Sequence, residues 1–139
     1  MNPLKEEIER MESMGVISKV SEPTDWVNSI VLVQKSNGSL RVCLDPRSLN
    51  IAVRRAHFML PTLGEIKARV NGATNFSVLD AKNGYWQIKL TKESAKLCTF
   101  LTPFGRYHYN RLPFGINSAG ELFCQQTHKY FGDIPNLHG

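Results

Sequence analysis

The sequence predicts a mixed α+β fold, and three local patterns indicate it. Apolar residues recur at helical spacing over residues 4–14. Two runs rich in β-branched and apolar residues, 27–34 and 40–44, flank Asn37-Gly38, a pair that favours a tight hairpin turn. Thr62 begins a Thr-Leu-Gly-Glu run, which has the spacing of a helical capping box. Helices and an antiparallel hairpin are therefore expected in one chain.

The first helix is expected to begin at Pro3 and to end at Gly15. Proline suits the first helical turn because the N–H that it lacks would have no acceptor there, and glycine after the last apolar position favours termination. The hairpin that follows places Lys35 at its tip and Arg41 on its return strand.

The central region is predicted to form one helix and two strands. The capped helix runs from Thr62 to Gly72. Phe76–Asp80 is apolar until its last residue and is expected to be a strand, and Tyr85–Leu90 alternates as a second strand. Because Asn83-Gly84 lies in the tight connection between them, Asp80 is expected at a strand end beside a turn.

Two further strands and a last helix are expected in the C-terminal third. Leu97–Leu101 and Tyr107–Tyr109 are strand candidates separated by Pro103-Phe104-Gly105. Asn117-Ser118 can cap a helix whose apolar positions begin at Ala119. Since no repeat, low-complexity stretch or linker interrupts the chain, one domain is predicted over residues 1–139.

The composition favours a polyanionic partner without proving one. The chain has 139 residues, a formal charge of +5 and a pI near 9.3, and its basic residues are spread along the sequence. An ordinary basic surface explains the charge equally well. No stretch approaches the length of a membrane span and no targeting signal is evident, so an intracellular location, cytoplasmic or nuclear, is expected and a membrane partner is not.

The run from Phe76 to Ile88, which contains Asp80, resembles the first carboxylate motif of reverse transcriptases of long-terminal-repeat retrotransposons, particularly the gypsy type. Segments 26–35 and 40–50 are similar to the fingers hairpin of that family and the stretch after it. Residues 102–107 and 111–119 resemble its nucleotide-pocket motif, and all of these segments occur in the family's order.

The resemblance implies a right-hand polymerase architecture, with fingers roughly at 1–54 and 88–118 and palm roughly at 55–87 and 119–139. The ferredoxin-like palm would be incomplete at the C-terminus. The resemblance also implies that the other two catalytic aspartates lie in a Tyr-x-Asp-Asp hairpin just beyond Gly139. With that hairpin, the thumb and the ribonuclease H domain absent, we expect no polymerase activity from this chain alone. A non-catalytic nucleic-acid-binding remnant of a retroelement is the alternative.

By the same resemblance, Asp80 is the catalytic, metal-binding carboxylate, and the carbonyl of Ala81 is a second metal ligand. Nucleotidyl transfer needs paired cations because the attacking and leaving oxygens both develop negative charge. Mg²⁺ suits such oxygen donors, and its two-metal site would be incomplete here. From the residues alone, Asp80 could equally cap a turn.

The resemblance also assigns binding roles around this carboxylate. RNA or DNA template-primer, deoxynucleoside triphosphates and the remainder of the polymerase are the implied partners. The nucleotide would contact Lys35, Arg41, Ala81, Tyr85, Phe114 and Gly115. Tyr85 would act as the gate against ribonucleotides; a core aromatic is its alternative. The template strand would contact Asp45, Arg47 and Asn50. A local Asp-Arg pair that stabilises the loop is the alternative for the first two.

Overall fold

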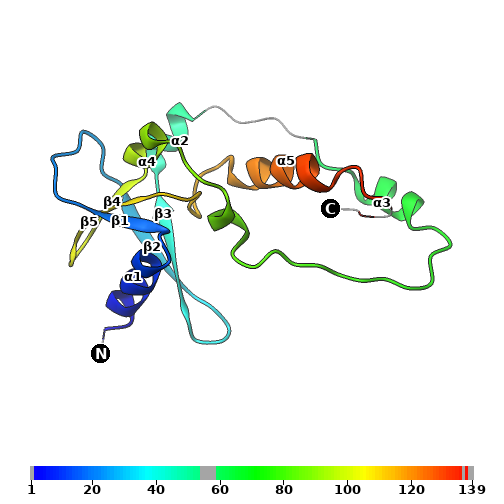
Figure 1. Ribbon diagram of the computed structural model, residues 1–139, viewed down its shortest axis with the longest axis horizontal. Helices are drawn as coiled ribbons and strands as arrows, with labels where there is room; N and C mark the ends of the chain where they lie inside the picture. The colour runs from blue at the N-terminus through cyan, green and yellow to red at the C-terminus, as the bar shows by residue number, and fades with distance from the viewer. Residues whose placement is uncertain (1, 54–58, 136, 138–139) are drawn as a thin grey trace.

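The computed structural model describes residues 2–53, 59–135 and 137. A lobe of short strands and helices lies beside an elongated part that contains α3 and α5 (Figure 1). In chain order the elements are α1 (Pro3–Ser13), β1 (Ile17–Val20), β2 (Ser29–Gln34), β3 (Leu40–Asp45), α2 (Arg47–Ala52), α3 (Leu63–Arg69), a 3₁₀ helix η1 (Gly84–Gln87), α4 (Lys92–Leu97), β4 (Thr99–Thr102), β5 (Gly105–Tyr109) and α5 (Ala119–Phe131). The predicted α+β class is confirmed.

Helix α1 begins where the sequence places it. The Asn2 side chain accepts a hydrogen bond from the Leu4 N–H at 3.0 Å, which satisfies one of the free donors of the first turn. Ile8 and Met11 form its buried face. Gly15 has φ of 72° and ends the helix, and the chain turns into β1, a strand that the sequence patterns did not predict.

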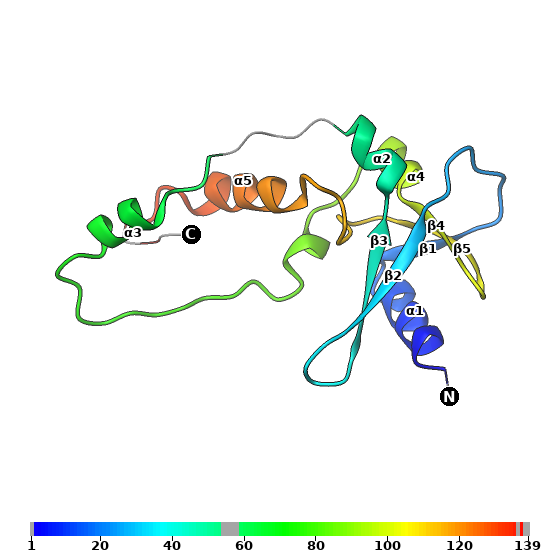
Figure 2. The ribbon, with the colours of Figure 1, turned by 180° about the vertical axis from the view of Figure 1, so that it is seen from behind.

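Two antiparallel sheets surround the core (Figure 2). Strand β5 lies between β1 and β4, and β2 pairs with β3 in register from Ser29–Asp45 to Gln34–Leu40. The two sheets are joined where the Asn28 N–H donates to the Thr99 carbonyl at 2.8 Å. Phe100 and Tyr109 are completely buried at this junction, so the core of the lobe holds both sheets against α1.

The predicted hairpin is confirmed, but its turn is longer than expected. The Lys35 N–H donates to the Ser39 carbonyl, and the Gly38 N–H donates back to the Lys35 carbonyl at 2.9 Å. Gly38 has φ of 83°, as required of the left-handed residue that ends a three-residue loop. Asn37 accepts from the Ser39 N–H instead of serving in a two-residue turn.

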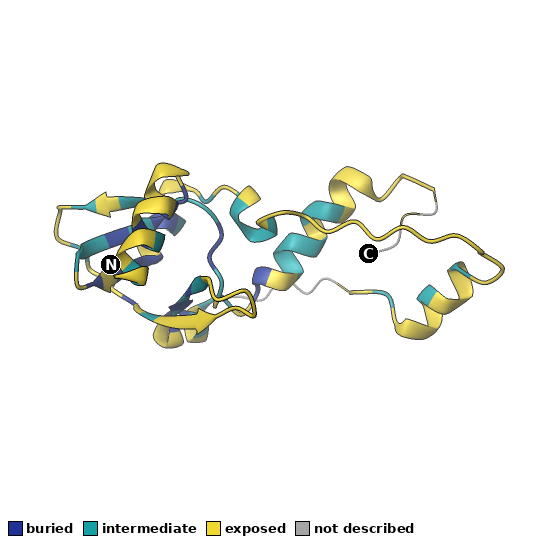
Figure 3. Ribbon diagram, turned by 90° about the horizontal axis from the view of Figure 1, so that it is seen from below, coloured by how far each residue is buried: buried dark blue, intermediate teal, exposed yellow. Residues whose placement is uncertain are grey.

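The strand predicted over Phe76–Asp80 is wrong. Residues 73–81 have no regular secondary structure, and the side chains of Val78 and Leu79 are 93% and 83% exposed. A strand is stable only when its backbone groups pair with a neighbour, and none of the described strands pairs with this segment. Figure 3 shows it as a fully exposed stretch.

The strand predicted over Tyr85–Leu90 is also wrong for most of its length. Gly84–Gln87 forms η1, and within the predicted strand only Lys89 makes a β-bridge, with Arg111. Consecutive residues of a strand point to opposite faces. Tyr85 and Trp86 instead both contact the Phe114 ring, with centroid separations of 5.0 and 6.4 Å, which a tight helical turn permits.

The remaining helices and strands follow their local signals with small shifts. Thr62 and Glu65 form the predicted capping box, each side chain bonded to the other's backbone N–H. The last helix is confirmed, although the Ser118 side chain makes no capping bond. Helix α4 was not predicted, and because it occupies 92–97, β4 begins two residues later than expected. Short α2 was not predicted either.

The predicted boundary between fingers and palm at 54–55 lies outside the described residues. Across residues 2–53, 59–135 and 137, the structure has no helix that is both long and apolar enough to cross a bilayer.

Candidate functional site

An open cleft of about 460 Å³ lies between the β2–β3 hairpin, the turn before η1 and the start of α5. Its walls come from segments far apart in the sequence. The residues that line it are Glu7, Lys35, Leu40, Arg41, Asp80, Ala81, Lys82, Asn83, Gly84, Tyr85, Trp86, Phe114 and Phe123. Six of the seven residues predicted at the nucleotide and metal positions are among them, and Gly115 is not.

The hairpin supplies the positive charge of the cleft. Lys35 follows β2 and is exposed, whereas Arg41 on β3 is half-buried. The guanidinium carbon of Arg41 lies 4.7 Å from the centre of the Phe114 ring, so the planar cation rests on an aromatic face. The Arg41 Nε atom is shielded from solvent and has no hydrogen-bond partner among the described residues. The Arg41 Nε atom is therefore a buried donor that no acceptor within the described residues satisfies.

Aromatic side chains form a second surface of the cleft, which includes the Phe114 ring under Arg41. The Tyr85 ring lies 5.0 Å from Phe114 and 5.7 Å from Phe123, in tilted arrangements that aromatic pairs favour. Gly84 makes this packing possible, because a Cβ atom there would lie 2.9 Å from the Phe123 ring. The chain enters η1 through Asn83, which has φ of 51°, a conformation that asparagine tolerates better than most residues.

Gly115 does not line the cleft. It lies in the loop that carries Phe114 and holds this loop against the β2–β3 hairpin. Its φ is 111°, and a Cβ atom there would overlap the carbonyl oxygen of Leu44 on β3. The Leu44 N–H also donates to the Phe114 carbonyl at 2.8 Å. The close backbone approach at Gly115 is therefore an approach to β3, and it sets the position of Phe114 under Arg41.

The carboxylate of the cleft comes from the extended segment. Asp80 and Ala81 are exposed at the end of residues 73–81 and face the cleft that Lys35 and Arg41 also line. In the part of the chain that the structure describes, no group of three or more His, Cys, Asp or Glu residues could hold a metal ion. One carboxylate and a backbone carbonyl are thus the oxygen donors that the predicted metal position offers.

Glu7 is a cleft residue that sequence reasoning missed. Its side chain is only 12% exposed, and both oxygens accept from Arg10, at 2.7 and 2.8 Å. This contact raises the pKa of Arg10. The Arg10 guanidinium carbon in turn lies 5.7 Å from the centre of the Trp86 ring. The spacing of Glu7 and Arg10 on one helix face predicts the ion pair, but only the fold reveals that the pair borders the cleft.

The three residues predicted to contact template lie outside the cleft. Asp45 and Arg47 form an ion pair at 3.2 Å, as the alternative interpretation expected. The Asn50 amide donates to the Gly115 carbonyl at 3.1 Å, and its oxygen accepts from the Asn117 N–H at 3.0 Å. Asn50 therefore links α2 to the loop that carries Phe114, and its predicted contact with template stays a prediction.

Comparisons with known proteins identify the family and the fold. Residues 33–138 match the family model described as reverse transcriptase (RNA-dependent DNA polymerase). The chain is 33% identical over 86 residues to an RNA-directed DNA polymerase homolog of Oenothera berteroana, with 62% of this chain and 61% of that protein aligned. It is 27% identical to the transposon Tf2-7 polyprotein of Schizosaccharomyces pombe, of which it spans 10%.

Among solved structures, the foamy viral protease–reverse transcriptase in complex with dsDNA superimposes with a TM-score of 0.79 over 98% of this chain and 29% of that chain. The two are 23% identical, so this likeness establishes the fold. The chain thus spans less than two thirds of each of these relatives, from 10% to 61% of their length.

Proposed function

Because this chain belongs to the reverse transcriptase (RNA-dependent DNA polymerase) family, we propose that its cleft binds an incoming deoxynucleoside triphosphate during DNA synthesis. The observation that carries the proposal is the convergence of four sequence segments. Residues 35–41, 80–85, 114 and 123 meet in one cleft that has cations on one side, aromatic rings on another and a carboxylate at its edge.

The chemistry of each wall fits one part of such a ligand. The Lys35 ammonium provides a point charge for phosphate oxygens. The planar Arg41 guanidinium can donate two parallel hydrogen bonds to them. The Tyr85 and Phe114 rings, 5.0 Å apart and inclined at 39°, provide an apolar surface for the sugar. On this assignment Tyr85 excludes the 2′-hydroxyl of a ribonucleotide.

Asp80 and the Ala81 carbonyl fit a hard divalent cation such as Mg²⁺, since both offer oxygen and both residues line the cleft. When bound, Mg²⁺ would neutralise charge on the phosphates and on the attacking hydroxyl. Glu7 cannot contribute as a free carboxylate because Arg10 occupies both of its oxygens. One free carboxylate is too few for two cations, so we propose that further ligands come from the rest of a longer polymerase.

We also propose the finer placement within the family. The chain would be the fingers and first part of the palm of a gypsy-type retrotransposon polyprotein, with RNA or DNA template-primer as its macromolecular partner. The match to the Tf2-7 polyprotein and the likeness to a reverse transcriptase in complex with dsDNA support this placement. Template would contact Asp45, Arg47 and the neighbourhood of Asn50.

Titration with a fluorescent deoxynucleoside triphosphate in Mg²⁺ tests the proposal on the 139-residue chain. The double variant Lys35→Gln, Arg41→Gln should bind at least tenfold more weakly, since it removes two charge-assisted contacts worth roughly 1.5–3 kcal/mol each. The matched control is Lys67→Gln, Arg69→Gln, which removes the same charge from exposed α3. Equal weakening by both pairs would contradict the cleft assignment.

A further inference from the structure

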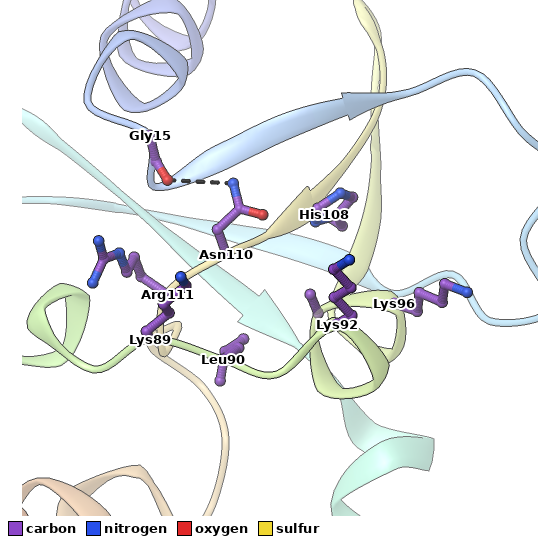
Figure 4. Close-up of a pocket in the computed structure, with 9 residues that line it drawn as sticks. Gly15, Lys89, Leu90, Lys92, Lys96, His108, Asn110 and Arg111 are labelled. Atoms are coloured by element: carbon purple, nitrogen blue, oxygen red, sulfur yellow. Dashed lines mark hydrogen bonds between the residues drawn. The ribbon is translucent and has the colours of Figure 1, made fainter.

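A second cavity, of about 540 Å³, lies on the sheet lobe and shares no lining residue with the nucleotide cleft (Figure 4). It is formed by α4, Gly15 in the turn before β1, His108 on β5 and the two chain segments that bridge at residues 89 and 111. Its polar lining, called the basic cavity below, consists of Lys89, Lys92, Lys96, His108, Asn110 and Arg111. Among the residues that the structure describes, no acidic one lines it.

The cations of the basic cavity form two pairs in which like charges lie close together. Lys92 and Lys96 are four residues apart on α4, a spacing at which like charges weaken a helix by a few tenths of a kcal/mol. Lys89 and Arg111 are partners across an antiparallel bridge, where like charges also repel. Two unfavourable pairs that meet in one cavity indicate that the positive charge serves a ligand.

Within the described part of the chain, none of these four cations forms an ion pair, and Glu93 on α4 lies outside the cavity lining. The ion pairs found there join Lys5 to Glu9, Arg10 to Glu7 and Arg47 to Asp45, all outside the basic cavity. In addition, the Nδ1 atom of His108 is shielded from solvent and has no hydrogen-bond partner among the described residues. The cavity therefore presents uncompensated charge together with an unsatisfied polar atom.

The base of the cavity is rigid. Asn110 donates through its side chain to the Gly15 carbonyl at 3.3 Å and to the Ser18 hydroxyl at 2.8 Å. Its backbone N–H donates to the Val16 carbonyl, and its own carbonyl accepts from the Leu90 N–H at 2.9 Å. The segments that carry Lys89 and Arg111 are thus fixed to β1, and a ligand would meet a preformed surface.

The side chains form a row more than a cage. In Figure 4 Lys92 extends toward His108, while Lys96 and Arg111 point in opposite directions. A compact anion would need donors that converge on one point. A row of separated cations instead matches successive phosphates of an extended chain.

We propose that the basic cavity holds the phosphate backbone of a single-stranded nucleic acid, at a position separate from the nucleotide cleft. That this strand is the template rests on the proposed function; the binding itself does not. The chain would then contact its nucleic acid at the base of the fingers hairpin and again around α4, which would keep an unpaired stretch against the sheet lobe.

The test is binding of a fluorescein-labelled single-stranded RNA to the 139-residue chain without Mg²⁺ or nucleotide. The variant Lys92→Gln, Lys96→Gln should bind roughly tenfold more weakly at low ionic strength. Its slope of log K against log salt should fall by about 0.7 for each phosphate that is no longer neutralised. Both residues are exposed and glutamine has a similar helix propensity, so α4 should stay folded. Circular dichroism checks this.

The control is Lys5→Gln, Lys67→Gln, which removes the same charge from exposed positions on α1 and α3. The proposal is supported if RNA affinity falls only in the Lys92 and Lys96 variant and nucleotide binding in the cleft is unchanged. An equal loss in both variants overturns it. Inorganic tripolyphosphate is a further arm: if it binds more tightly than RNA and depends on Lys92 and Lys96, the cavity is a small-anion site and the proposal fails. If nucleotide fails to bind the cleft but RNA binding still depends on α4, only the proposed polymerase role fails.

Discussion

The guanidinium of Arg41 rests on the ring of Phe114, 4.7 Å from its centre, although 72 residues of other structure lie between the two in the sequence. This contact joins the β2–β3 hairpin to the loop before α5. It holds the Arg41 guanidinium against one wall of the cleft, and the Nε atom has no hydrogen-bond partner among the described residues. Packing within the chain therefore sets the position of this cation in the cleft.

Arg41→Lys should weaken triphosphate binding even though the charge is kept. Lysine has no planar fork to stack on Phe114, and the stacking of a desolvated cation contributes about 1–2 kcal/mol, or roughly 5–30-fold in affinity. Nucleotide titration measures the loss. Lys35→Arg is the control, since exposed Lys35 makes no ring contact among the described residues, and a comparable loss there would contradict the stacking role.

Gly115→Ala should destabilise the fold. Its φ of 111° strains any other residue, and its Cβ would overlap the Leu44 carbonyl oxygen, so we expect a loss of about 2 kcal/mol or more in the free energy of unfolding. Urea denaturation gives the value. Gly38→Ala is the matched control because φ is 83° there but the surrounding space is open, and it should cost no more than about 1–2 kcal/mol.

Asn50→Ala should reduce stability more clearly than it reduces binding of nucleic acid. Its side chain makes hydrogen bonds to Gly115 and Asn117, and their loss should cost about 1–2 kcal/mol. Urea denaturation beside RNA titration separates the two effects. If binding falls tenfold while stability is unchanged, Asn50 contacts template directly and the structural role is wrong.

Asp80→Asn should leave the unfolding midpoint unchanged, because Asp80 is exposed and makes no hydrogen bond or ion pair within the described residues. It should abolish the increase in nucleotide affinity on addition of Mg²⁺. In a longer polymerase that contains this domain, it should also abolish incorporation while primer-template binding persists. Retained incorporation would exclude Asp80 as a metal ligand.

Tyr85→Ala should reduce the preference for deoxynucleotides over ribonucleotides. The Tyr85 ring packs between Phe114 and Phe123, so its removal opens the sugar side of the cleft. Competition between matched deoxy- and ribonucleoside triphosphates measures the ratio of affinities. Phe123→Leu, which keeps the tyrosine, is the control; an unchanged ratio in Tyr85→Ala would remove the gate role.

Local patterns predicted the parts of the fold that depend on short-range contacts. The N-terminal helix, the hairpin around Asn37-Gly38 and the capping box at Thr62 all appear, because their hydrogen bonds form within a few residues. The strand at Phe76–Asp80 does not, because a strand depends on a distant partner for half of its backbone bonds.

The sequence by itself determined the family and six of the thirteen residues that line the cleft, because ordered motifs carry that information without any coordinates. Only the tertiary structure decided which residues meet. It placed Arg41 on Phe114, assigned Gly115 to the contact with β3, and brought Glu7 to the edge of the cleft. It also paired Lys89 with Arg111 and so created the basic cavity. These contacts join segments that are far apart in the chain. No local sequence pattern indicates that such segments lie close together in space.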